Sequence, residues 1–234
     1  MDGIRERVES IRQRVSDLSL ERWGRAAQII AVTKTVEPER IHELLACGIT
    51  RIGENRAQEI LQKRPLLDAS FRIDCIGRLQ TNKVKYIIDQ VGMIQSLDRM
   101  NMGLEIDRRA VKMGRRMPVL IEINIGNEPQ KGGIPAEELM PFAREAAGLE
   151  GLQIRGLMAV MPETDQPQEL RPLFAKMRSL FEQLQSEAIR GTEIDELSMG
   201  LSGDYEVAAE EGATHLRLGS AIFGKRPLLK LKNA

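Results

Sequence analysis

A lysine follows a short apolar segment near the start of the chain. Residues 29–32 read Ile-Ile-Ala-Val, which is typical of a strand buried on both faces, and Lys34 comes two residues later. We expect Lys34 to end this strand at the mouth of the core, where partial desolvation can lower the pKa of an amine until it acts as a nucleophile. Many strands also end in a solvated lysine, so this segment alone indicates no more than a candidate nucleophile.

Two segments rich in glycine and serine lie near the other end of the chain. Residues 198–204 read Ser-Met-Gly-Leu-Ser-Gly-Asp just before an expected helix, and Gly219 and Ser220 follow the last expected strand. Their hydroxyls and free backbone N–H groups suit an anion. Either segment alone could be an ordinary turn with a serine cap. Together, at the ends of neighbouring strands, Ser198, Ser202, Gly219 and Ser220 favour a phosphate site.

An amine, a phosphate site and the guanidinium of Arg217 together suggest a ligand that carries both an aldehyde and a phosphate. Pyridoxal 5′-phosphate (PLP) has both groups, and Lys34 would hold its aldehyde covalently as a Schiff base. Arg217 is placed to donate to the pyridine nitrogen, and since a guanidinium keeps its protons, it would weaken the ring as an electron sink. The alternative is another phosphorylated metabolite, with Lys34 serving only as a cation.

Strands and helices alternate along the whole chain. Hydrophobic patterning predicts helices between strands at 29–34, 49–53, 71–76, 92–97, 118–124, 152–160, 194–198 and 215–218. We expect Asp98 to cap the helix after the fourth strand. Eight such units predict an α/β protein with a single (β/α)8 barrel, and the carboxyl ends of its strands would bring the candidate residues to one face. An open doubly wound sheet is the alternative, but the sequence has no G-x-G-x-x-G motif.

We expect one domain over residues 1–234, with the barrel at 28–224 and a leading helix at 1–18. The helix is predicted by one apolar stripe: Ile4, Val8, Ile11, Val15 and Leu18.

The composition excludes several classes of function. Lysine plus arginine and aspartate plus glutamate number 34 each, and aromatic residues are 3% of the chain, so we expect no nucleic-acid partner. Two cysteines, Cys47 and Cys75, are too few for a disulfide framework or a zinc site, and no metal is expected. With no membrane-spanning segment or signal sequence in view, we expect a cytoplasmic protein with no membrane partner.

Several motifs, in this order and spacing, resemble one known family. They are AVTK ending at Lys34, GENRAQE at 53–59, IGRLQTNK at 76–83, INIGNEPQKGG at 123–133, GLMAV at 156–160, SMGLSGD at 198–204 and RLGSAIFG at 217–224. The chain resembles the pyridoxal phosphate homeostasis proteins, which are fold-type-III (β/α)8 barrels similar to the N-terminal domain of alanine racemase.

The resemblance implies particular roles for residues and partners. It implies PLP bound covalently to Lys34, phosphate contacts around Ser198, Ser202, Gly219 and Ser220, Arg217 at the ring nitrogen, and Asn55 and Met158 lining the ring. It also implies a PLP carrier that supplies PLP-dependent apo-enzymes. We expect a monomer or a weak dimer. Two positions depart from the family pattern, since Arg78 replaces a histidine and Arg56 a tyrosine. Both border the expected mouth, where the extra cations would either alter what approaches the cofactor or hold a second anion.

Catalysis by such a barrel needs a second base opposite the lysine. In the resembled racemases a tyrosine supplies it with the help of a second domain, for which this chain has no room. Tyr86 and Tyr205 lie in or near predicted helices, and we interpret His42 and His215 as packed or solvated. We therefore predict no catalytic residues. The alternative is a PLP-dependent racemase-like enzyme that takes a base from a partner subunit.

Overall fold

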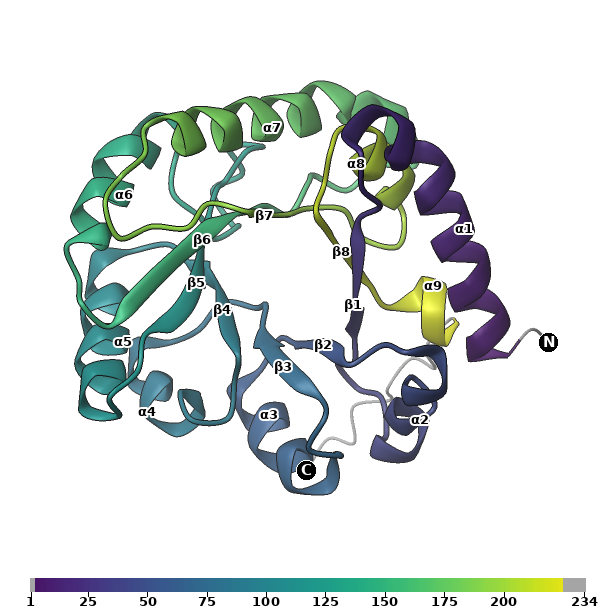
Figure 1. The fold of residues 1–234 in the computed structure, drawn as a ribbon, viewed down its shortest axis with the longest axis horizontal. Coiled ribbons are helices and arrows are strands. Elements are labelled where there is room, and N and C mark those ends of the chain that lie inside the picture. Colours follow the sequence, from purple (N-terminus) through teal and green to yellow (C-terminus); the bar gives the residue numbers. More distant parts are fainter. Residues whose placement is uncertain (1–2, 225–234) are drawn as a thin grey trace.

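Eight parallel strands close into a barrel in the computed structural model, which describes residues 3–224 (Figure 1). The strands are β1 (Gln28–Val32), β2 (Arg51–Glu54), β3 (Arg72–Cys75), β4 (Met93–Leu97), β5 (Met117–Glu122), β6 (Leu152–Met158), β7 (Glu196–Ser198) and β8 (His215–Leu218). Each strand pairs with the next, and β1 closes the ring on β8, with Gln28 opposite His215 and Ala31 opposite Leu218. The predicted (β/α)8 barrel is confirmed, and the open sheet is excluded.

Helices surround the ring of strands on its outer side (Figure 1). The α-helices are α1 (Ile4–Trp23), α2 (Pro38–His42), α3 (Ala57–Lys63), α4 (Val84–Ile87), α5 (Met100–Lys112), α6 (Leu139–Ala147), α7 (Arg171–Ser186), α8 (Tyr205–Glu210) and α9 (Ser220–Phe223). Short 3-10 helices are η1 (Leu45–Cys47), η2 (Arg64–Leu66), η3 (Thr81–Lys83), η4 (Ala136–Glu138) and η5 (Pro167–Leu170). Because helices cover the strands from outside, β1 and β5 are mainly apolar, whereas β2, β3, β7 and β8 also carry charged residues.

The leading helix α1 lies against the outside of the barrel beside α8 and α9 (Figure 1). Four residues of the predicted stripe are buried: Ile4, Val8, Ile11 and Val15. The helix is longer than the predicted 1–18 because Trp23 is held by a hydrogen bond from its indole to the carbonyl of Glu210, 3.0 Å long. Gly24, with φ of 67°, then ends the helix in the left-handed conformation.

Other element boundaries also differ from the predictions. β1 ends at Val32, two residues before Lys34, and a short helix, α9, follows β8 where none was expected. The predicted cap at Asp98 is wrong: Arg99 occupies the cap position of α5, with no side-chain capping bond. The carboxylate of Asp98 instead pairs with the Arg99 guanidinium, so an ion pair replaces the cap.

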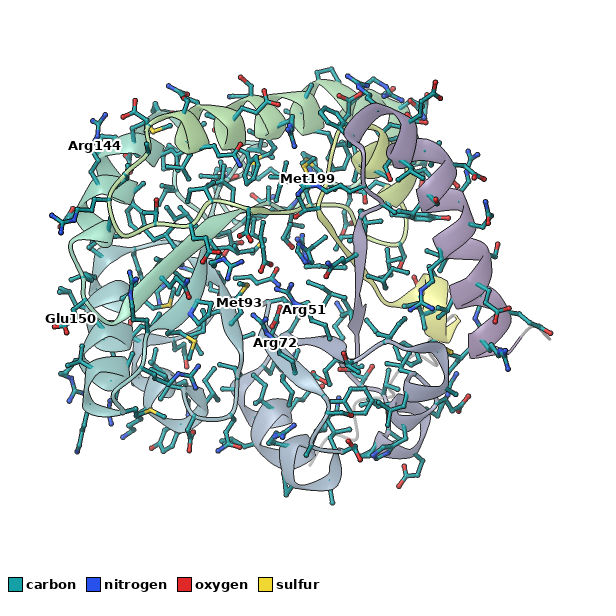
Figure 2. All side chains as sticks on the ribbon, viewed as in Figure 1. Arg51, Arg72, Met93, Arg144, Glu150 and Met199 are labelled. Atoms are coloured by element: carbon teal, nitrogen blue, oxygen red, sulfur yellow. The ribbon has the colours of Figure 1, made fainter. Side chains whose placement is uncertain are left out.

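The interior of the barrel is partly apolar and partly charged. Met93, Leu120 and Met158 form a small buried cluster separate from the main core between strands and helices. Arg51 lies beside Met93 inside the ring, whereas Arg144 and Glu150 point away from it (Figure 2). Cys47 and Cys75 are both buried and free. Between residues 3 and 224 there is no helix long and apolar enough to cross a membrane, and no cluster of three potential metal ligands.

Candidate functional site

A cavity of about 550 Å³ opens where β1, β7 and β8 end. Its size falls in the range of about 300–1,000 Å³ that is usual for small-molecule sites. Eight residues line it: Val32, Lys34, Leu201, Ser202, Gly203, Arg217, Gly219 and Ser220. The structure therefore brings five sequence-predicted site residues, from opposite ends of the chain, into one cavity.

Lys34 projects from a turn beyond the end of β1. The N–H of Val36 donates to the carbonyl of Thr33 over 2.9 Å and closes this turn. The Lys34 side chain is exposed, so the expected partial desolvation of its amine is wrong for this structure. The reason is that the strand stops at Val32, which leaves the lysine outside the core and accessible to a ligand.

The turn that carries Lys34 is fixed by charged residues of β2 and α3. Thr35 has a φ of 59°, which is unfavourable for a β-branched residue, and its N–H donates to Glu59 Oε2 over 2.9 Å. Lys63 Nζ donates to the carbonyl of Thr33 (2.7 Å) and to Glu54 Oε1 (2.8 Å). Burial raises the pKa of Glu54, although hydrogen bonds from Lys63 and Thr33 oppose it. These contacts to the turn were not predicted from the sequence. The one sequence feature that points to them is the GENRAQE motif, which contains both Glu54 and Glu59.

Opposite the lysine, the loops after β7 and β8 are joined through Ser202. Its Oγ accepts hydrogen bonds from the N–H groups of Gly219 (3.0 Å) and Ala221 (3.1 Å). Gly200 allows the first loop to turn here: its φ is 91°, and a Cβ would lie 2.5 Å from that of Ala208. Since Ser202 occupies these two N–H groups, the donors of this corner that a phosphate meets first are the hydroxyl protons of Ser202 and Ser220.

Arg217 reaches the same cavity from β8, although it is only 2% exposed. Its Nη1 donates to Ser198 Oγ and its Nη2 to the carbonyl of Ala159, each over 2.7 Å. Burial lowers the pKa of Arg217 to about 10, while Glu122 and Asp204 act through space to raise it. The group remains charged at neutral pH, and no carboxylate within residues 3–224 makes an ion pair with it.

The other three predicted site residues lie outside this cavity. Ser198 is fully buried and donates to Gln95 Oε1 over 2.8 Å. Its hydroxyl oxygen accepts from Arg217, so Ser198 holds the guanidinium in position and does not line the cavity. Met158 is fully buried inside the barrel. Asn55 lines a second cavity, which lies over β2 and β3.

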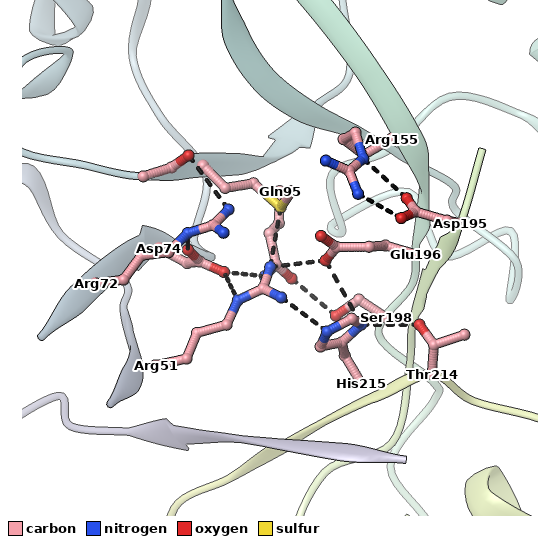
Figure 3. Close-up of polar contacts among 12 residues, drawn as sticks. Arg51, Arg72, Asp74, Gln95, Arg155, Asp195, Glu196, Ser198, Thr214 and His215 are labelled. Atoms are coloured by element: carbon pink, nitrogen blue, oxygen red, sulfur yellow. Dashed lines mark hydrogen bonds and ion pairs between the residues drawn. The ribbon is translucent and has the colours of Figure 1, made fainter. Parts of the chain in front are cut away.

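A chain of hydrogen bonds leads from Ser198 through the barrel interior to its other end (Figure 3). Gln95 Nε2 donates to Asp74 Oδ2, and Arg51 Nε donates to the same oxygen, each over 2.7 Å. Arg51 also contacts Glu196 and His215 over 2.7 Å. Sequence analysis missed this network, whose only signal was the occurrence of charged residues inside predicted strands.

Two titratable groups of the interior have strongly shifted pKa values. Burial, aided by Arg51 and other arginines, lowers the pKa of His215 to about 3, so this packed histidine is neutral at physiological pH. Burial and the charge of Asp98 raise the pKa of Glu122 to about 7, against the effects of Arg217, Arg78 and Arg99. The buried Oε2 of Glu122 has no hydrogen-bond partner within residues 3–224.

The fold and the cavity define a (β/α)8 barrel of the alanine racemase type. Residues 2–227 match the family described as "Alanine racemase, N-terminal domain". A pyridoxal phosphate homeostasis protein of Aquifex aeolicus is 43% identical over 225 residues, which cover 94% of this chain and 97% of that protein. One from Pasteurella multocida is 36% identical, covering 88% and 89% of the two chains. The chain therefore belongs to the alanine racemase N-terminal domain family and, within it, to the pyridoxal phosphate homeostasis proteins.

Solved structures support the same assignment. PipY of Synechococcus elongatus, in a structure with PLP bound, is 31% identical and superposes with a TM-score of 0.83, covering 94% of this chain and all of that one. Alanine racemase of Corynebacterium glutamicum is only 15% identical, with a TM-score of 0.72 over 98% of this chain and 63% of that one. The second likeness shows the shared barrel fold alone.

Proposed function

We propose that this protein binds PLP in the cavity beside Lys34 and serves PLP homeostasis in the cytoplasm, holding the cofactor and supplying it to apo-enzymes. The observation that carries the proposal is the cavity itself, in which an accessible lysine amine, two serine hydroxyls and a buried guanidinium converge. Relatives named as PLP homeostasis proteins, and a PLP-bound neighbour with nearly the same fold, support it.

Each part of the cavity has a distinct task in this proposal. Lys34 would hold PLP covalently, its amine condensing with the aldehyde that the cofactor supplies to give a Schiff base and water. Ser202 and Ser220 would hold the phosphate with their hydroxyls, and the Gly219 N–H would join them by exchanging its bond to Ser202 for one to the phosphate. Arg217 uses two of its five N–H donors within the protein and offers another to the ring nitrogen.

The remaining predicted residues support the ligand from nearby. Ser198 fixes the Arg217 guanidinium. Asn55 and Met158 would border the ring, as the family resemblance implies, although neither lines this cavity: Asn55 lines the neighbouring one and Met158 is buried beneath.

We also propose that the bound cofactor is held and not used in catalysis. Racemisation needs a second base, and neither Tyr86 nor Tyr205 lines the cavity. Tyr86 lies on α4 and Tyr205 begins α8. The permanent charge of Arg217 opposes protonation of the ring nitrogen and thereby weakens electron withdrawal by the ring.

Absorbance spectroscopy tests the site and the ligand together. The PLP-loaded protein should show a band near the visible edge that borohydride abolishes, and the reduced label should map to the peptide containing Lys34. Lys34→Ala should lose the band. Lys83→Ala is the matched control, because Lys83 is exposed and lines the neighbouring cavity. A reducible band that survives in Lys34→Ala would rule out this lysine.

Two further measurements separate a carrier from an enzyme. The loaded protein, but not Lys34→Ala, should restore the activity of a PLP-dependent apo-enzyme. Incorporation of solvent deuterium at the α-carbon of an amino acid, well above the rate with free PLP, would favour the racemase-like alternative.

A further inference from the structure

A second cavity, of about 970 Å³, opens over the ends of β2 and β3. Four cationic residues line it, namely Arg56, Arg78, Lys83 and Arg99, and none of its lining residues is acidic. The full chain has equal numbers of basic and acidic residues. This cavity is therefore locally positive, although the chain as a whole is neutral. It is separate from the cavity beside Lys34, since neither Lys34 nor Ser202 lines it.

The four cations differ in how far the protein already satisfies them. Arg99 pairs with Asp98 and donates to the carbonyl of Leu79 over 2.6 Å, so its guanidinium is held in place. Lys83 packs over the ring of Tyr86, with its Nζ 5.7 Å from the ring centre. Arg56 and Arg78 are exposed, and within residues 3–224 the guanidinium of neither makes a hydrogen bond or an ion pair. Two forked donors are thus free to meet a ligand.

The nearest carboxylates leave this charge largely uncompensated. Glu59 acts on Arg56 through space, but its Oε2 accepts from the backbone of Thr35 and from Lys63. Glu122 acts on Arg78 in the same way, yet it is buried and makes no ion pair with it.

We propose that this cavity is a second anion site, which binds a small ligand carrying two or more linked phosphate groups. A phosphate carries at most about two negative charges. Arg56, Arg78 and Lys83 make no ion pair within residues 3–224, so their three charges match a diphosphate or triphosphate better than a single phosphate. Guanidinium forks bind phosphate oxygens in pairs, and the carboxamides of Gln58 and Gln80 add neutral donors. Inorganic polyphosphate and the polyphosphate chain of a nucleotide share this chemistry.

Isothermal titration of the PLP-loaded protein with pyrophosphate tests the proposal. One equivalent should bind, more tightly than orthophosphate and less tightly as salt increases. Arg78→Ala and Arg56→Ala should each weaken binding about tenfold. Lys112→Ala is the matched control, because it removes an exposed cation of α5 that does not line the cavity, and it should leave binding unchanged.

The same titration of Lys34→Ala separates this site from the proposed PLP site. Pyrophosphate binding that persists there and still depends on Arg78 supports the second site whether or not PLP binds as proposed. A nucleoside triphosphate that binds like inorganic triphosphate indicates recognition of the phosphates alone, whereas tighter binding identifies a nucleotide. Absence of binding, binding insensitive to both arginine substitutions, or tighter binding of an acidic peptide would overturn the proposal.

Discussion

Two arginines, Arg51 partly buried and Arg217 fully buried, lie at opposite ends of the barrel interior and differ in what neutralises their charge. Arg51, at the start of β2, makes ion pairs with Asp74 and Glu196, each over 2.7 Å (Figure 3). Burial alone would lower the pKa of Arg51, but the two carboxylates outweigh it and raise the pKa. Within residues 3–224 the guanidinium of Arg217, near the end of β8, donates hydrogen bonds only to a hydroxyl and a carbonyl, and burial lowers its pKa to about 10.

This difference separates an arginine that stabilises the fold from one that is available to a ligand. The charge of Arg51 is compensated within the protein, and a ligand could add little. The charge of Arg217 has no ion-pair partner among residues 3–224, and it borders a cavity. An anionic or electron-rich ligand in this cavity would supply the hydrogen-bond acceptor that the protein does not provide for this charge.

Arg51→Met should cause the largest loss of stability. The substitution removes the short ion pairs of two buried acidic side chains, Asp74 and Glu196, and leaves Asp74 with Gln95 and a longer contact to Arg72. Breaking a buried pair in this way costs about 3–5 kcal/mol. Urea denaturation at neutral pH measures the change in the free energy of unfolding. The folded fraction should still bind PLP with nearly unchanged affinity.

Arg155→Met is the control for that substitution. Arg155 also makes a forked pair, with Asp195, but both side chains are partly exposed (Figure 3). Its loss should cost less than about 1 kcal/mol. Equal losses for the two variants would contradict the structural role of Arg51.

Glu122→Gln should change how stability depends on pH, because burial and the charge of Asp98 disfavour the ionised form of Glu122. Its pKa is raised from 4.5 to about 7. The folded state therefore holds a proton that the unfolded state releases, so this contribution is complete below pH 4.5 and is lost as the pH rises through 7. The free energy of unfolding of the natural chain, minus that of Glu122→Gln, should fall by roughly 3 kcal/mol across this range.

Urea denaturation of both proteins between pH 4.5 and 8 measures that difference. His215, whose lowered pKa has the opposite effect on stability, is common to both proteins and cancels. A difference that does not change with pH would show that Glu122 stays ionised throughout.

The sequence was sufficient to predict the barrel because its main signal is local. Alternating strands and helices can be recognised from the period of the hydrophobic residues and from the turn residues between them. Strand β8, for example, begins and ends where predicted. The predicted ends of helices and strands were wrong where residues distant in the sequence form the local contacts. The turn at Lys34 depends on Glu54, Glu59 and Lys63, and Asp98 pairs with Arg99 instead of capping α5.

The site was predictable in part for a related reason. Residues at strand ends meet at the mouth of any such barrel, so Lys34, Ser202 and Arg217 could be grouped from the sequence. Which way a side chain points depends on strand register, and Ser198, paired with His215 in the sheet, turns into the barrel. Arg51 and Glu196 lie 145 residues apart, and nothing local reveals their contact.

Arg217→Met should affect ligand binding more than folding. It removes a buried charge that has no ion pair, so the main loss is that of the hydrogen bonds to Ser198 and Ala159. We expect the free energy of unfolding to fall by about 2 kcal/mol. PLP affinity should fall at least about tenfold with the loss of a charge-assisted hydrogen bond. Urea denaturation and spectrophotometric PLP titration give the two values. A stability loss equal to that of Arg51→Met would remove the distinction between the two arginines.

Ser198→Ala should have the smallest effect and should act through Arg217. The substitution removes one acceptor of the guanidinium, while the bond to the Ala159 carbonyl remains, so we expect a loss of about 1 kcal/mol in stability and a severalfold loss in PLP affinity. Ser198→Thr keeps the hydroxyl and is the control.

A double-mutant cycle decides whether Ser198 positions Arg217 or contacts the phosphate itself. If Ser198 only orients the guanidinium, Ser198→Ala should not weaken PLP binding further once Arg217 is methionine, because the oriented group is gone. If the hydroxyl binds the phosphate, the two substitutions should weaken affinity additively. The buried position of Ser198 between Gln95 and Arg217 leads us to expect the first result.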